Sequence, residues 1–179
     1  MENKLELNFE INELQLNLVD LLMQANNLHK KYEKRKKDIT FEVFNINKLE
    51  ETEYYKVCSA SLEELNRKFE EYKNNKDDIH NANNNLKNKA SLKKSSESEI
   101  EKINNTLDEF KKIDLENNKL DMYKTISEEF DFIKEDLNLI YTFENVEITE
   151  EIFVFNLVKL KFIEKTIELI TKIILELNA

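Results

Sequence analysis

The sequence contains no glycine, no proline and no tryptophan in 179 residues. At ordinary usage, a chain of this length would hold roughly twelve glycines and nine prolines. Phosphate-binding loops, dinucleotide-binding fingerprints, EF-hand loops and nucleophile elbows need glycine at fixed backbone positions, so these sites are excluded. Tight hairpins also depend on glycine, which argues against a large antiparallel sheet. A fold with few corners, and therefore with long helices, is what remains.

The chain also has only one cysteine and no net positive charge. The single cysteine, Cys58, excludes an internal disulfide. A net charge of −10 disfavours non-specific binding to nucleic acid or anionic membranes. The first ten residues lack the basic start and apolar core of a secretory signal. Charged residues interrupt the apolar stretch Ile152 to Leu177, so no transmembrane segment is expected. We expect an intracellular, soluble protein of the cytoplasm or the nucleus.

A seven-residue apolar repeat runs through the first part of the chain. Its two rows are Leu7, Leu14, Leu21 and Leu28, and Ile11, Leu18, Ala25 and Tyr32. The alternating spacing of four and three is the seam of a coiled coil or a bundle helix. Phe9, Leu16 and Met23 form a further row beside this seam. The pattern predicts a helix over residues 1–39, with its apolar stripe ending near Tyr32.

Two segments, 40–47 and 142–148, are rich in aromatic and β-branched residues and have no heptad pattern. We interpret both as breaks between helices. If the chain folds back on itself, the two breaks could meet at one end of the molecule. They are then either a short pair of extended segments or two plain helix connections with apolar side chains.

Residues 48–97 are predicted to form a second helix, and residues 98–141 a third. The second helix has two possible cap signatures, Asn47 with Glu50 and Ser61 with Glu64, so its start is ambiguous. Residues 74–98 are rich in Asn, Lys and Ser, and we interpret them as a solvated helix extension or a flexible hinge. Ser98 with Glu101 is a capping box that predicts a restart.

The last predicted helix, residues 149–179, is the most apolar part of the chain. Thr149 followed by Glu150 and Glu151 indicates an N-cap with acidic residues in the first turn. Its two seam rows are Phe153, Leu160, Ile167 and Ile174, and Ile163, Ile170 and Leu177. Further apolar residues widen the stripe beyond what one neighbouring helix can cover. This helix therefore either lies centrally among the helices of its own chain or completes an interface with another chain.

The residues that could perform chemistry are few. The metal-ligand pool is His29, His80 and Cys58 with carboxylates, and no pair of Glu-x-x-His motifs or fuller Cys/His set is present. We expect both histidines to be exposed polar residues on helices and Cys58 to be a buried core thiol. No cofactor, metal, small-molecule substrate or catalytic residue is expected.

One basic run is the strongest local charge feature. Its core, Lys34, Arg35, Lys36 and Lys37, fits a minimal nuclear-localisation pattern. The alternatives are direct contact with nucleic-acid phosphate and a solvated helix end whose charge suits the helix dipole. An acidic window holds Glu144, Glu147, Glu150 and Glu151. If the two breaks meet, this window would lie against the basic run and neutralise it.

The sequence therefore predicts an all-α protein of one domain, an elongated bundle or coiled coil of about four long helices. Its expected function is that of a non-enzymatic structural or adaptor subunit in a larger helical assembly of the cytoskeletal, kinetochore, tethering or scaffold type. Its expected partners are other helical proteins in a hetero-complex. The alternative is a self-assembling homo-oligomer or a membrane-surface helical module. The predicted partner interface consists of Leu7, Ile11, Leu14, Leu18, Leu21, Leu28, Phe153, Leu160, Ile163, Ile167, Ile170, Ile174 and Leu177.

Overall fold

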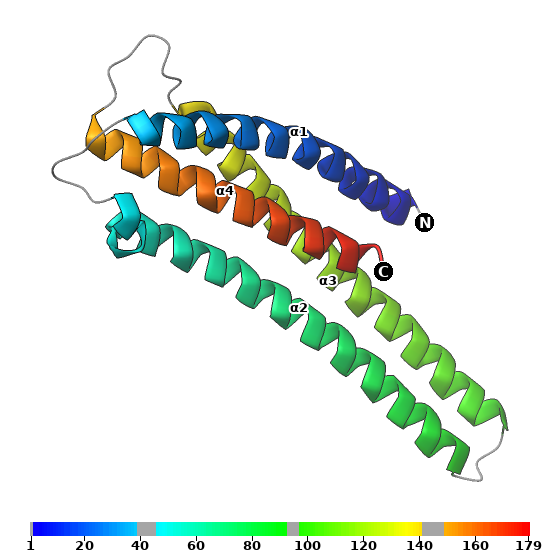
Figure 1. Ribbon diagram of the computed structural model, residues 1–179. Helices are drawn as coiled ribbons and strands as arrows, with labels where there is room; N and C mark the ends of the chain where they lie inside the picture. The colour runs from blue at the N-terminus through cyan, green and yellow to red at the C-terminus, as the bar shows by residue number, and fades with distance from the viewer. Residues whose placement is uncertain (1, 39–45, 93–96, 141–148) are drawn as a thin grey trace. The chain divides into compact units, whose positions relative to one another are not determined.

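Four long helices make up nearly all of the computed structural model, which describes residues 2–38, 46–92, 97–140 and 149–179 (Figure 1). In chain order they are α1 (Glu2–Asp38), α2 (Glu53–Leu92), α3 (Glu97–Leu139) and α4 (Glu150–Leu177), with a 3₁₀ turn, η1 (Ile46–Glu51), before α2. Within the described ranges the chain forms no strand. The all-α class with four long helices is thus confirmed.

Helices α1, α3 and α4 begin and end within two residues of the predicted bounds, whereas α2 is five residues shorter at each end than the predicted 48–97. Ile46 and Asn47, at the end of the first break, already belong to η1 and are not extended. The remainder of 40–47 and all of 142–148 lie outside the described residues, and so does any pairing between them. In the Asn-rich segment 74–98, α2 continues as a helix to Leu92.

Threonine hydroxyls fix the starts of two helices. The Thr149 hydroxyl accepts a hydrogen bond from the Ile152 backbone N–H at 3.3 Å, which confirms the predicted cap of α4. The cap of α2 is neither Asn47 nor Ser61. Thr52 takes this role, because its hydroxyl accepts from the Tyr55 N–H at 3.2 Å and donates to the Leu49 carbonyl at 2.7 Å. The bonds from the Ile152 and Tyr55 N–H groups each satisfy a backbone donor that a helix start would leave unpaired.

The chain divides into two compact units. The first comprises residues 1–66 and 125–179, and the second comprises residues 67–124. Helices α2 and α3 each contribute to both units. The prediction of a single domain is not tested by this division and stays a prediction.

In the first unit, α4 is the central element. Its buried side chains point in several directions, because α1 covers one side and η1 with the start of α2 covers another. The end of α3 is tied to it by a bond from the Lys159 ammonium to the Asp136 carboxylate at 3.1 Å. The wide apolar stripe of α4 is therefore explained by neighbours within the chain, the first of the two alternatives that the sequence left open.

The second unit comprises the end of α2 and the start of α3. Among its described side chains, Phe69, Tyr72 and Met122 are buried. Polar contacts on the surface of α2 run between neighbouring turns, as in the pairs Arg67 with Glu71 at 3.1 Å and Glu70 with Lys73 at 3.0 Å. Such exposed pairs each contribute only about 0.3–0.5 kcal/mol.

Candidate interaction surface

The contact between α1 and α4 is the most extensive in the described part of the chain, and the two helices lie side by side and antiparallel (Figure 1). The inner face of α1 supplies a row of buried residues, which are Ile11, Leu14, Leu18, Leu21, Ala25 and Tyr32. They follow the predicted seam, with Leu7 and Leu28 only half-buried. Burial of each large aliphatic side chain contributes about 1.5–3 kcal/mol, so this seam is a major part of the core.

A polar pair lies inside this apolar contact. The Asn156 side-chain amide donates to the Tyr32 hydroxyl at 2.9 Å, and both residues are buried. The Tyr32 ring also stacks on Phe153, with ring centroids 5.2 Å apart. Burial raises the pKa of the Tyr32 phenol, and the bond from Asn156 partly opposes this shift. Sequence analysis missed Asn156, whose only signal is a polar residue within the apolar stripe of α4.

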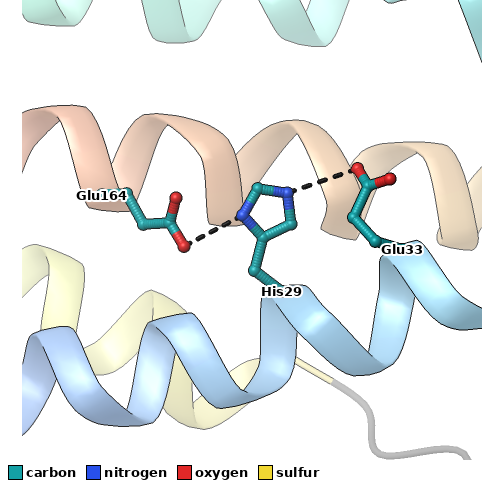
Figure 2. A network of polar contacts seen from close by, with 3 residues as sticks. All are labelled: His29, Glu33 and Glu164. Atoms are coloured by element: carbon teal, nitrogen blue, oxygen red, sulfur yellow. Dashed lines mark hydrogen bonds and ion pairs between the residues drawn. The ribbon is translucent and has the colours of Figure 1, made fainter.

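His29 links the same two helices at the margin of their contact. Its Nδ1 lies 2.9 Å from an oxygen of Glu164 on α4, and its Nε2 lies 3.4 Å from an oxygen of Glu33 one turn along α1 (Figure 2). An imidazolium can donate to both carboxylates, whereas a neutral ring can donate only once. The prediction that His29 is exposed is therefore wrong, because Glu164 on α4 partly covers it. His80 is exposed, as predicted.

On another side of α4, a smaller apolar cluster faces the start of α2. Val154, Val158 and Phe162 are buried there against the partly buried Leu49, Tyr54, Tyr55, Cys58 and Leu62. Tyr55 meets Phe162, and Tyr54 meets Phe155, edge to face. Lysines of α4 extend over these rings, with Lys161 above Tyr55 and Lys165 above Phe162. The ammonium nitrogens lie 5.6 Å and 5.0 Å from these two ring centroids, within the range of a cation–π attraction.

Cys58 packs against this cluster, but the prediction that it is a buried core thiol is wrong, because its side chain is only partly buried. The thiol is half-buried, and burial is the largest cause that raises its pKa above the ordinary value. The nearby Lys159 opposes this shift, and Asp136 adds to it. Because the thiolate is the reactive form of cysteine, this environment makes Cys58 a poor nucleophile.

The outer face of α1 carries a second apolar row that nothing in the described part of the chain covers. Phe9, Leu16 and Met23 are separated by seven residues and are 63%, 70% and 60% exposed, and Val19 between them is 55% exposed. Residues two apart on a helix point about 200° away from each other. Each member of the row is two positions from a buried residue of the inner seam. Helix α1 is therefore apolar on two opposite faces.

The predicted partner-interface residues are found mostly inside the chain. Eleven of the thirteen are buried, and Leu7 and Leu28 are half-buried. Those of α1 and those of α4 come together in one unit of the chain. Their contact with another chain stays a prediction. Of the exposed row, Phe9, Leu16 and Met23 were visible in the sequence as a row beside the seam, and Val19 was not singled out.

The basic run lies at the end of α1. Lys34 and Arg35 are exposed and Lys36 is half-buried, whereas the side chain of Lys37 is outside the described residues. In the acidic window, Glu144 and Glu147 also lie outside them, so their predicted contact with the basic run is untested. Glu151 accepts a hydrogen bond from the Tyr54 hydroxyl at 2.7 Å. This bond raises the pKa of the Tyr54 phenol.

Two further searches of the described residues are negative. No three His, Cys, Asp or Glu side chains within these residues are grouped so that they could hold a metal ion. None of the described helices combines the length and the apolar character needed to cross a bilayer.

No family model, curated protein or solved structure matches this chain. Evidence on function therefore comes from the residues of this chain. Among those described, the exposed apolar face of α1 points most directly to a binding surface.

Proposed function

We propose that the protein is a non-enzymatic structural or adaptor subunit that binds other helical proteins within a larger assembly. The outer apolar row of α1 is the binding surface in this proposal. The inner seam and α4 form the support that holds α1 in place. In the same proposal, Lys34, Arg35, Lys36 and Lys37 act as a nuclear-localisation signal that directs the assembly to the nucleus.

The single observation that carries the proposal is the exposure of Phe9, Leu16, Val19 and Met23 at heptad spacing. Single exposed apolar residues are ordinary, but an aligned apolar row typically marks an interaction site. Seven-residue spacing is the pattern by which one helix packs along another. Because α1 is already held as a helix by α4, a partner does not need to supply the cost of helix formation.

The test is quantitative affinity purification of the full-length chain from cells of its source, with three forms compared. The first is the wild type, and the second is the outer-row variant Leu16→Ser/Met23→Ser. The third is a matched control, Val57→Ser/Leu175→Ser, which removes two equally exposed apolar side chains elsewhere. All three should show equal helicity by far-UV circular dichroism.

The proposal predicts one or more proteins that co-purify with the wild type and the control but are lost from the outer-row variant. Absolute mass from light scattering on the purified chain is measured in parallel. A mass of two or more chains that falls to one in the outer-row variant would instead favour the self-assembling alternative. Identical co-purification and identical mass in all three forms would remove the role assigned to this surface.

A further inference from the structure

The outer row of α1, formed by Phe9, Leu16, Val19 and Met23, is flanked by residues of different charge on its two sides. On one side, one exposed acidic residue occurs in each heptad, at Glu6, Glu13 and Asp20. The corresponding positions on the other side are the uncharged Asn8, Gln15 and Leu22, all half-buried. In coiled coils, residues at these flanking positions decide which partner is chosen and in which orientation. The outer face of α1 is therefore an apolar row with one negative margin.

A second copy of this chain fits the face poorly. In an antiparallel pair the two acidic margins would lie against each other, and like charges across an interface oppose binding. In a parallel pair each acidic margin would face an uncharged one, so no ion pair would form. Each copy also brings a net charge of −10, which makes the copies repel each other at long range.

The size of the row also argues against pairing through apolar contact alone. Phe9 to Met23 spans about 21 Å of helix, at about 1.5 Å per residue. The next heptad position is Lys30, where the apolar row ends. A stable protein interface buries about 800 Å² on each partner, which four side chains on one helix face do not supply. The partner must therefore add charge complementarity to the apolar contact.

We infer that the outer face of α1 binds an amphipathic helix of a different protein that has a heptad apolar seam flanked by lysine or arginine. This inference rests on the proposed function and adds the chemistry of the partner. Leu16, Val19 and Met23 supply the apolar contact with the partner seam. Glu13 and Asp20 lie opposite the basic flank of the partner and set its orientation along α1.

The experiment uses two designed peptides of about four heptads with identical apolar seams. One peptide carries lysine at both flanking positions of each heptad, and the other carries glutamate there, so that each repels its own copies. Fluorescence anisotropy of the labelled peptides is followed while the full chain is added. Titrations are made at about 0.05 M and about 0.5 M salt, where screening differs strongly.

The lysine peptide should bind the wild type at least about tenfold more tightly than the glutamate peptide in low salt, and the difference should shrink in high salt. Glu13→Lys/Asp20→Lys should reverse the preference. Leu16→Ser/Met23→Ser should reduce binding of the lysine peptide about tenfold or more, and Val57→Ser/Leu175→Ser should not.

Equal binding of the two peptides, no binding of either, or lysine-peptide binding that survives Leu16→Ser/Met23→Ser would overturn the inference. Loss of cellular partners from the outer-row variant together with such a result would leave the proposed function standing and remove only the partner chemistry. Light scattering that shows a dimer dependent on Leu16 and Met23 would identify the occupant as a second copy and would also overturn the inference.

Discussion

The Asn156 amide, buried in the core between α1 and α4, donates a hydrogen bond to the Tyr32 hydroxyl at 2.9 Å. A buried amide or hydroxyl that loses its partner costs about 1–3 kcal/mol. Sliding either helix by one turn would separate the two groups while leaving apolar residues in contact. The pair therefore favours one register of α1 against α4, as single buried asparagines do in coiled coils.

Replacement Tyr32→Phe tests this role. The substitution keeps the ring that stacks on Phe153 and removes the oxygen that accepts from Asn156. We expect the free energy of unfolding to fall by about 1–3 kcal/mol, because the buried amide is left without this acceptor. Urea denaturation followed by far-UV circular dichroism measures the change.

The control combines Tyr32→Phe with Asn156→Leu. Replacing both partners of a buried hydrogen bond by apolar groups of similar shape is nearly neutral or stabilising. The double variant should therefore be more stable than Tyr32→Phe alone. A double variant that is no more stable than the single one would contradict the idea that the lost acceptor causes the effect.

His29 on α1 contacts Glu164 on α4 and Glu33 on its own helix, so the coupling energy between two helices can be compared with that within one helix. The Glu164 oxygen lies 2.9 Å from the ring and is largely covered, whereas the Glu33 oxygen lies 3.4 Å away and is about half-exposed. We expect a double-mutant cycle of His29→Ala and Glu164→Ala to give a coupling within the range of about 0.5–3 kcal/mol.

The matched cycle pairs His29→Ala with Glu33→Ala, where a contact within one helix should give about 0.3–0.5 kcal/mol. Both cycles are measured by urea denaturation under one set of conditions. Equal couplings in the two cycles would mean that the contact between helices contributes no more than an ordinary surface pair.

At the scale of elements, local patterns predicted most of the fold. The heptads of α1 and α4 identified the buried residues, and Thr149 identified the start of α4, because both depend on residues within one or two turns. The start of α2 was ambiguous, since Asn47 and Ser61 also match the cap pattern. Thr52 takes the role because it directly precedes α2 and its hydroxyl accepts from the Tyr55 N–H in the first turn.

The features that the sequence did not predict depend on contacts between distant residues. His29 meets Glu164 across 135 positions of the chain, and no local spacing shows such a pair. The inner and outer rows of α1 are both apolar, so the row that is exposed is known only once α4 is placed. For the same reason, the apolar stripe of α4 could not be assigned to a core or to an interface from sequence alone.

For the whole molecule, stability should depend on pH on the alkaline side. Burial raises the pKa of Cys58 and of Tyr32 in the folded chain. The unfolded chain therefore loses these protons at lower pH than the folded chain does, which favours unfolding as pH rises. The stabilisation is complete below the ordinary pKa of each group, about 8.5 for cysteine and about 10 for tyrosine, and is lost above it.

The contribution of the Cys58 thiol to this pH dependence can be measured apart from that of the tyrosine phenols, because cysteine has the lower ordinary pKa. Between pH of about 7.5 and about 9.5, below the ordinary pKa of tyrosine, Cys58 is the group with a raised pKa that begins to ionise in the unfolded chain. The wild type should lose unfolding free energy across this window, because the folded thiol keeps its proton to higher pH than the unfolded one. Cys58→Ala should remove most of that loss, whatever its own stability at the lower pH.

Urea denaturation of both forms under reducing conditions at the two pH values gives the comparison. A wild-type stability that rises across the window, or an equal loss in both forms, would show that Cys58 does not link folding to pH.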